Sequence, residues 1–119
     1  MNNIEKVDGY LKEKLKDPYF REIYELQEQK LNIVKHIIDY RIANGLTQGQ
    51  LANKAGVTQQ HISKIENGDF SSILTLEKIL LFIGYTVKIR AVPLNHKVKS
   101  SIERTRTKHN LQLAVRPAL

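Results

Sequence analysis

The sequence predicts a mainly all-α protein built around one five-helix domain at residues 31–92, which closes with one C-terminal β-strand. A helical extension at residues 1–30 precedes this domain, and a basic flexible tail at residues 93–119 follows it. Three observations support the prediction. Apolar residues recur every three or four positions over most of the first 84 residues. Glycines follow several of these runs, where helices can end. Residues 86–92, TVKIRAV, alternate apolar and basic side chains as strands do.

The N-terminal extension contains the patterns of two helices. A short amphipathic helix is indicated by apolar residues on one face, namely Ile4, Val7, Leu11 and Leu15. Asp17 and Pro18 then start a second helix, because Asp caps helices well and Pro suits the first helical position. No Pro or Gly follows before Gly45, so this helix can run unbroken to Asn44, about 40 Å at 1.5 Å per residue.

Residues 47–68, TQGQLANKAGVTQQHISKIENG, predict two short helices joined by a tight turn. Thr47 and Thr58 are good N-caps for the two helices. Gly56 suits the left-handed conformation that ends the first one. The second helix points its isoleucines back at the first and leaves hydrogen-bonding side chains outward: Gln59, Gln60, His61, Ser63 and Lys64. Side chains of this kind are what the recognition of base edges requires.

The C-terminal third begins with a fifth helix, which Thr75 caps and Gly84 ends. The strand after it cannot pair its own backbone groups. We therefore expect it to pair with the same strand of a second copy, so that the dimer strand comprises Val87, Ile89 and Ala91. Residues 93–119 carry six Lys and Arg against one Glu and show little periodicity, which favours a mobile basic tail.

Composition and the absence of certain motifs bear on four questions: whether the protein binds nucleic acid, binds a metal, is an enzyme or spans a membrane. The net charge of +7 is compatible with a nucleic-acid partner, although a basic solvent-exposed surface explains it equally well. The chain has no Cys, and its four His lack metal-ligand spacing, so we expect no metal site. No Gly-rich phosphate loop, HExxH or GxSxG motif occurs, so we expect no cofactor, no catalytic residue and no enzyme activity. No segment has the length of a membrane span or the apolar core of a signal peptide, which predicts a cytoplasmic protein without a membrane partner.

The central stretch carries a family resemblance through its pattern TQ-x-x-LA-x-x-x-GV-T-x-x-x-I-S-x-I-E-x-G. This resembles the helix-turn-helix of the lambdoid phage repressor and Cro family, also called the XRE family, and implies a repressor-like DNA-binding domain. An ordinary αα-hairpin would explain the apolar positions but not the outward glutamine pair. The resemblance also implies a structural ion pair between Arg41 and Glu66. Gly49, inside the first helix, departs from the family pattern and costs about 1 kcal/mol relative to Ala.

The resemblance assigns DNA contacts by position. Base contacts fall to Gln59 and Gln60, since bidentate Gln–adenine pairing is the usual geometry. Gln48 and Asn67 would contact phosphates. The full DNA-binding set is Gln48, Thr58, Gln59, Gln60, His61, Ser63, Lys64 and Asn67.

Two segments outside the motif extend the resemblance. KDPYF-x-x-x-Y at residues 16–24 and GYTVKIRAVP at residues 84–93 are similar to HigA-type antitoxins of bacterial toxin–antitoxin systems, and the terminal strand also to HipB-type antitoxins. This likeness implies a sequence-specific antitoxin that represses its own operon as a homodimer on double-stranded DNA with an inverted-repeat operator. It also implies direct neutralisation of a small RNase-type toxin. The alternative is a stand-alone XRE-family repressor with no toxin partner, and an RNA binder is disfavoured because RRM and KH signatures are absent.

Apolar side chains of the N-terminal extension give a separate indication of a protein partner. A five-helix core does not need them, and exposed aromatic residues often mark interfaces. They could instead cover the bundle or lie in a homodimer. The candidates for toxin contact are Tyr10, Leu11, Leu15, Tyr19, Phe20, Ile23 and Tyr24.

Overall fold

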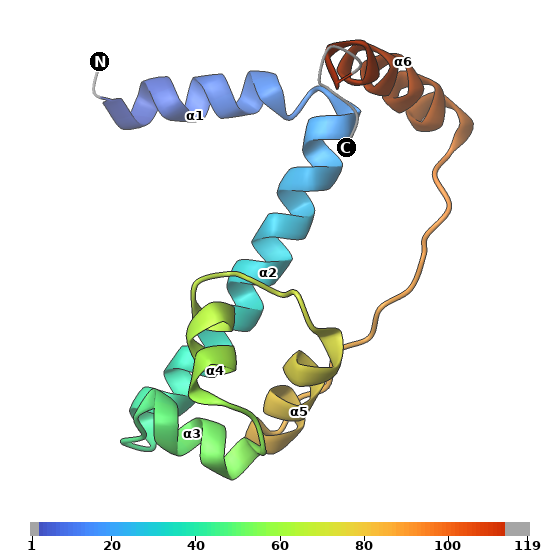
Figure 1. Cartoon of the computed structure of the whole chain (residues 1–119). Coiled ribbons are helices and arrows are strands. Elements are labelled where there is room, and N and C mark those ends of the chain that lie inside the picture. Colours follow the sequence, from blue (N-terminus) through green and yellow to red (C-terminus); the bar gives the residue numbers. More distant parts are fainter. Residues whose placement is uncertain (1–2, 114–119) are drawn as a thin grey trace. The chain divides into compact units, whose positions relative to one another are not determined.

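The computed structural model describes the backbone of residues 3–113 and the side chains of residues 6–106. Within that part of the chain, six helices and no strand are found (Figure 1): α1 (Asn3–Lys14), α2 (Pro18–Ala43), α3 (Gln48–Ala55), α4 (Gln59–Glu66), α5 (Ile73–Ile83) and α6 (His96–Leu113). The mainly helical fold class is therefore confirmed. None of the described helices combines the length and hydropathy that crossing a membrane requires.

The chain divides into two compact units. One is Gln27–Arg90, which contains most of α2 together with α3, α4 and α5. The other comprises the described residues up to Leu26 and from Ala91 onward, with α1 and α6. The helix α2 is unbroken across the boundary between the units, as its lack of internal Pro and Gly predicts.

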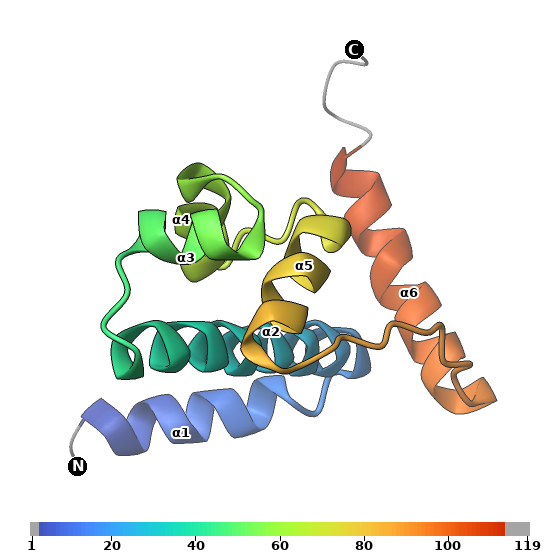
Figure 2. The same ribbon diagram turned by 90° about the horizontal axis from the view of Figure 1, so that it is seen from below.

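The Gln27–Arg90 unit is built around one apolar core. Figure 2 shows α3, α4 and α5 gathered on one side of the C-terminal half of α2. The buried side chains come from all four helices: Ile37, Leu51, Ala52, Ile62, Ile65, Leu76, Ile79, Leu80 and Ile83. The small Ala52 lets α4 approach α3 closely, since it adds little bulk at the contact. This core fixes α4 in place and so determines which of its side chains reach solvent.

The described residues do not form the predicted C-terminal strand. Residues 84–95 contain neither helix nor strand, and the described chain offers no sheet edge to receive them. The start of the segment is instead bound to α5. The Val87 amide donates to Glu77 Oε2 at 3.3 Å, and Thr86 Oγ1 donates to Glu77 Oε1 at 2.7 Å. Val87 therefore packs on the core and its amide is already satisfied, while Ile89 and Ala91 remain exposed.

The prediction of a tail without regular structure is also wrong, because His96–Leu113 forms α6. The Asn95 side chain accepts a hydrogen bond from the Val98 amide at 2.8 Å, which satisfies a donor of the first turn. Val98, Ile102 and Thr105 follow one another at helical spacing and are half-buried. The stripe is short and partly polar, which explains why the sequence pattern did not reveal it. Residues 114–119, the end of the predicted tail, lie outside the described residues.

Candidate nucleic-acid interface

The first helix of the motif begins and ends as its sequence predicts. The Gln50 amide donates to Thr47 Oγ1 at 3.1 Å, and the Thr47 amide donates to Gln50 Oε1 at 2.9 Å, which completes a capping box. Gly56 ends α3 with φ of 75°, in the left-handed region that Gly occupies without a Cβ penalty. The Val57 amide donates to Ala52 O at 2.9 Å across this turn. These local bonds set the direction in which the chain enters α4.

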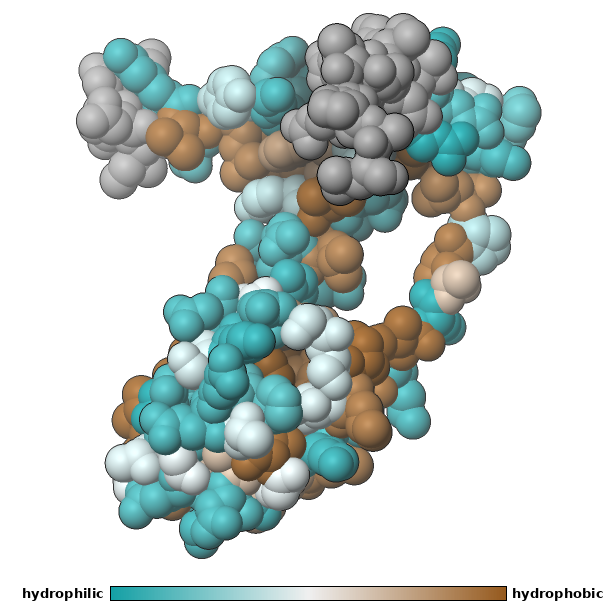
Figure 3. All heavy atoms as spheres, in the orientation of Figure 1, coloured by the Kyte–Doolittle hydropathy of each residue, from teal (hydrophilic) through white to brown (hydrophobic). Residues whose placement is uncertain are grey.

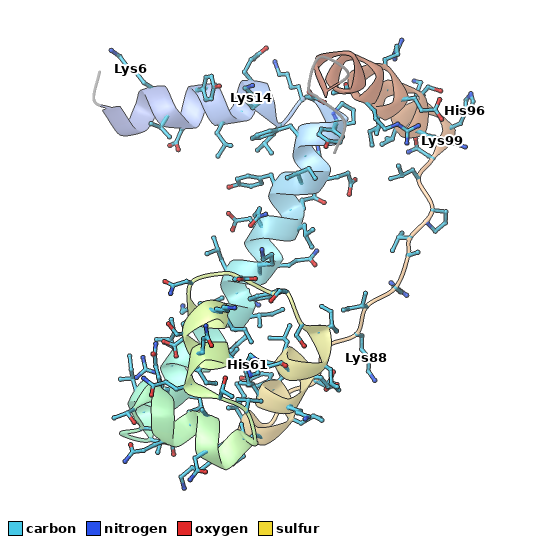
Figure 4. The ribbon with its side chains drawn as sticks, viewed as in Figure 1. Lys6, Lys14, His61, Lys88, His96 and Lys99 are labelled. Atoms are coloured by element: carbon cyan, nitrogen blue, oxygen red, sulfur yellow. The ribbon has the colours of Figure 1, made fainter. Side chains whose placement is uncertain are left out.

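The second helix is capped by Thr58 and His61 together. The His61 amide donates to Thr58 Oγ1 at 3.2 Å, and the Thr58 amide donates to His61 Nδ1 at 3.3 Å. A neutral imidazole that accepts at Nδ1 carries its proton on Nε2. His61 is thus half-buried and bonded to its own helix start, on the side of α4 that faces α5 (Figure 4). His61 therefore does not project outward beside Gln59 and Gln60, as the sequence had predicted.

The outer face of α4 is polar and its inner face is apolar. Ile62 and Ile65 are buried in the core. Gln59, Gln60 and Lys64 are exposed, whereas Ser63 is half-buried. Figure 3 shows hydrophilic side chains covering the surface of α3 and α4. Three of the predicted DNA-contacting side chains therefore project from one short helix that the core holds rigidly.

Two predicted phosphate contacts have side chains that already bond within the protein. Gln48 Nε2 donates to Glu66 Oε1 at 3.3 Å. Asn67 Nδ2 donates to Ser63 O at 2.9 Å and so helps to end α4. The backbone amide of Gln48 belongs to the first turn of α3, whose donors have no acceptor inside the helix. That amide, rather than the Gln48 side chain, is the better phosphate donor at this position.

Arg41 and Glu66 form the ion pair that the sequence predicts. Arg41 Nε donates to Glu66 Oε2 at 2.8 Å and Arg41 Nη2 donates to Glu66 Oε1 at 3.0 Å, while Nη1 donates to Leu46 O at 3.1 Å. The side chains are 21% and 8% exposed, respectively. Hydrogen bonding to Glu66 raises the pKa of Arg41 above its ordinary value, against the smaller opposing effect of burial. The pair ties the end of α2 to the end of α4.

Gly49 has a role that the sequence did not reveal. A Cβ atom at this position would lie 3.2 Å from Gln59 Oε1 and 3.7 Å from Gln59 Cδ. The Gln59 carboxamide therefore lies next to the space that a side chain at position 49 would occupy. A glycine inside a helix, two residues after a good N-cap signal, was the only hint in the sequence that this position is special.

The seven candidate residues for toxin contact lie near the end of α1 and at the start of α2. Tyr10 is 66% exposed and Ile23 is also exposed, whereas the other five candidates are half-buried: Leu11, Leu15, Tyr19, Phe20 and Tyr24. The rings of Phe20 and Tyr24 stack with centroids 6.2 Å apart. Lys14 Nζ lies 5.7 Å from the Tyr10 ring centroid and 5.8 Å from that of Phe20 (Figure 4). We call this group of seven candidates the α1–α2 corner.

Comparison with known protein families also points to a helix-turn-helix in the Gln27–Arg90 unit. Residues 37–88 match a family model described as helix-turn-helix. A solved structure described as a toxin–antitoxin module from Streptococcus pneumoniae is similar to the chain, with 32% sequence identity and a TM-score of 0.49. The similarity covers 63% of this chain and 80% of that one. No curated protein matches the chain.

Proposed function

We propose that this chain, which belongs to the XRE-type helix-turn-helix family through residues 37–88, is a DNA-binding antitoxin. It binds an inverted-repeat operator as a homodimer and represses its own operon. It also neutralises a small RNA-cleaving toxin by direct contact. The observation that carries the DNA-binding part is the two-faced helix α4, which is anchored by buried isoleucines and presents exposed glutamines.

The chemistry of α4 fits the major groove. That groove is about 12 Å wide and admits one α-helix, and Gln can bond adenine N6 and N7 at the same time. Gln59 and Gln60, at the start of α4, lie where recognition helices contact base edges. Lys64, one turn further on, carries a positive charge suited to a phosphate. The Arg41–Glu66 pair holds α4 at its other end and leaves the glutamines free for the groove.

The experiment that tests DNA binding uses the full chain and the DNA upstream of its own gene. Equilibrium binding is measured at several salt concentrations, with a scrambled duplex of equal length and composition as competitor. A specific reader binds its site about a thousandfold or more tighter than unrelated DNA. Equal affinity for the two duplexes at every salt concentration would contradict the proposal.

Gln60→Ala is expected to weaken operator binding by about 1–3 kcal/mol and to relax the preference at one base pair in each half-site. The reason is the loss of one bidentate contact, without any change in the buried core. Affinities for a set of single-base-pair operator variants provide the measurement. Gln29→Ala, which removes an exposed glutamine of α2 outside the motif, is the matched control and should bind like the wild type. A uniform loss of affinity for Gln60→Ala across all duplexes would exclude base recognition by this side chain.

The α1–α2 corner supports the toxin-binding part of the proposal. Its aromatic rings are preorganised by the Phe20–Tyr24 stack, and Lys14 lies over two of the rings. Rigid aromatic groups that lose water on association dominate many protein interfaces. Val7 of α1 and Leu26 of α2 are further exposed apolar residues of these two helices. No residue of this corner belongs to the core of the Gln27–Arg90 unit, so its apolar character has no role in that core.

Tyr10→Asp is expected to weaken binding of the protein encoded beside this gene by about thirtyfold or more, which is the effect of removing one interface hot spot. A charge at the centre of an apolar surface must be desolvated when the partner binds. Coexpression, pull-down and growth rescue provide the measurement. Leu74→Asp places the same charge on an exposed leucine of α5 and should leave neutralisation unchanged. Absence of any interaction with the wild-type chain would favour the stand-alone repressor.

A further inference from the structure

We propose that Gly49 of α3 is a specificity-determining position, because its missing side chain lets α3 hold the Gln59 carboxamide in the orientation that meets a base. This inference rests on the proposed DNA-binding function and adds a residue that does not itself touch DNA. It concerns how the first helix of the motif controls a side chain on the second.

The contact is short and specific. A Cβ on Gly49 would lie 3.2 Å from Gln59 Oε1, 3.7 Å from Gln59 Cδ and 3.9 Å from Thr47 Oγ1. The hydrogen bonds of the described residues leave the Gln59 carboxamide without a partner in the protein. A side chain at position 49 would therefore take space that is now open to this carboxamide.

The backbone of Gly49 does not explain why glycine occupies the position. Gly45, Gly56, Gly68 and Gly84 all have positive φ, where a side chain would be strained. Gly49 is absent from that group and lies within the regular helix α3. A glycine there costs about 1 kcal/mol relative to alanine. The feature that alanine would change, besides helix propensity, is the space taken by Gln59.

A methyl group at position 49 would move the Gln59 carboxamide by a few tenths of an ångström. Gln59 is exposed and its side chain is flexible, so this shift should not unfold the protein. Bidentate pairing is less tolerant, because both donor–acceptor distances must stay near 3 Å and their angles near linear. Gly49→Ala should therefore keep or raise stability while it alters base preference.

The experiment compares the wild type with Gly49→Ala, Gln59→Ala and the double variant, all as full chains. Affinities are measured for operators substituted one base pair at a time, and unfolding is followed in urea. Gly9→Ala is the matched control: it makes the same change inside helix α1, where nothing lies within 4 Å of the new Cβ. It should alter neither affinity nor preference.

The expected result is a loss of discrimination of about fivefold or more at the base pair that Gln59 contacts, since a good bidentate pair discriminates by at least that much. Gly49→Ala should show it without loss of stability, and should add nothing further when Gln59 is already alanine. Unchanged discrimination in Gly49→Ala, with Gln59→Ala impaired, would overturn this inference alone. A wild type without any base preference would overturn the proposed function and this inference with it.

Discussion

Arg41→Ala is expected to lower the free energy of unfolding by about 3 kcal/mol, at the lower end of the cost of breaking a buried ion pair. The Glu66 carboxylate is only 8% exposed, so it would stay desolvated with Gln48 as its remaining side-chain donor. The Leu46 carbonyl would lose the Arg41 Nη1 donor as well. A fifth of the Arg41 side chain still meets water, which keeps the loss from being larger.

Chemical denaturation of the full chain measures this effect, and two variants control it. Lys16→Ala breaks the Lys16–Glu13 pair, whose side chains are 73% and 74% exposed. Exposed pairs contribute little, so this variant should match the wild type. Replacing both Arg41 and Glu66 by methionine should restore much of the loss, since no charge then remains buried. If Arg41→Ala is no more harmful than Lys16→Ala, the pair does not hold α4 in place.

Ile62→Ala is expected to cost about 2–5 kcal/mol, the range found for large-to-small changes in cores. Ile62 is fully buried within the cluster that joins α2, α3, α4 and α5. Its loss opens a cavity directly beneath the face of α4 that we assign to DNA. Operator affinity should then fall because less of the protein is folded, not because a base contact is lost.

Urea midpoints together with operator binding separate these two causes. Ile42→Ala removes the same atoms from an exposed isoleucine of α2 and should leave stability near the wild-type value. Addition of operator DNA should raise the midpoint of Ile62→Ala, since a ligand of the folded state stabilises it by mass action. Equal stability of the two variants would show that Ile62 does not anchor the recognition helix.

Helix boundaries and caps within the motif were predictable because they depend on neighbouring residues. The cap predicted at Thr75 is wrong: α5 begins at Ile73, and its cap is Ser72, whose Oγ accepts from the Thr75 amide at 3.2 Å. The bonds of Thr47 with Gln50, and the left-handed Gly56, follow from chemistry within one turn of chain. Thr58 likewise caps α4 as its sequence position indicates. The Arg41–Glu66 pair joins residues 25 positions apart, and only the family resemblance identified it.

The strand and the tail were not predicted correctly, for two different reasons. Alternation in TVKIRAV is compatible with a strand but does not supply an edge to pair with. Glu77 of α5 bonds Thr86 and Val87 instead. In α6, serine and threonine share the half-buried face with Val98 and Ile102, which hides its periodicity from a reading based on apolar residues alone.

The sequence predicted only in part which side chains of the motif face solvent and which bond within the protein. Exposure of Gln59, Gln60 and Lys64 follows from helical periodicity. The positions of Gln48 and His61 depend instead on hydrogen bonds within the protein. Gln48 Nε2 donates to Glu66 Oε1, and the Thr58 amide donates to His61 Nδ1. Such competition between donors and acceptors depends on three-dimensional proximity, which the spacing of residues in the chain does not encode.

Selection of preferred sequences from random double-stranded DNA tests the central claim most directly. With the wild-type chain, we expect enrichment of an inverted repeat whose half-site centres lie about 34–36 Å apart, one turn of DNA. The Gln59→Ala/Gln60→Ala double variant, with the same core, should lose the enriched bases at the positions that α4 meets. Recovery of one identical sequence by both proteins, or of no sequence by the wild type, would contradict recognition of bases by this helix.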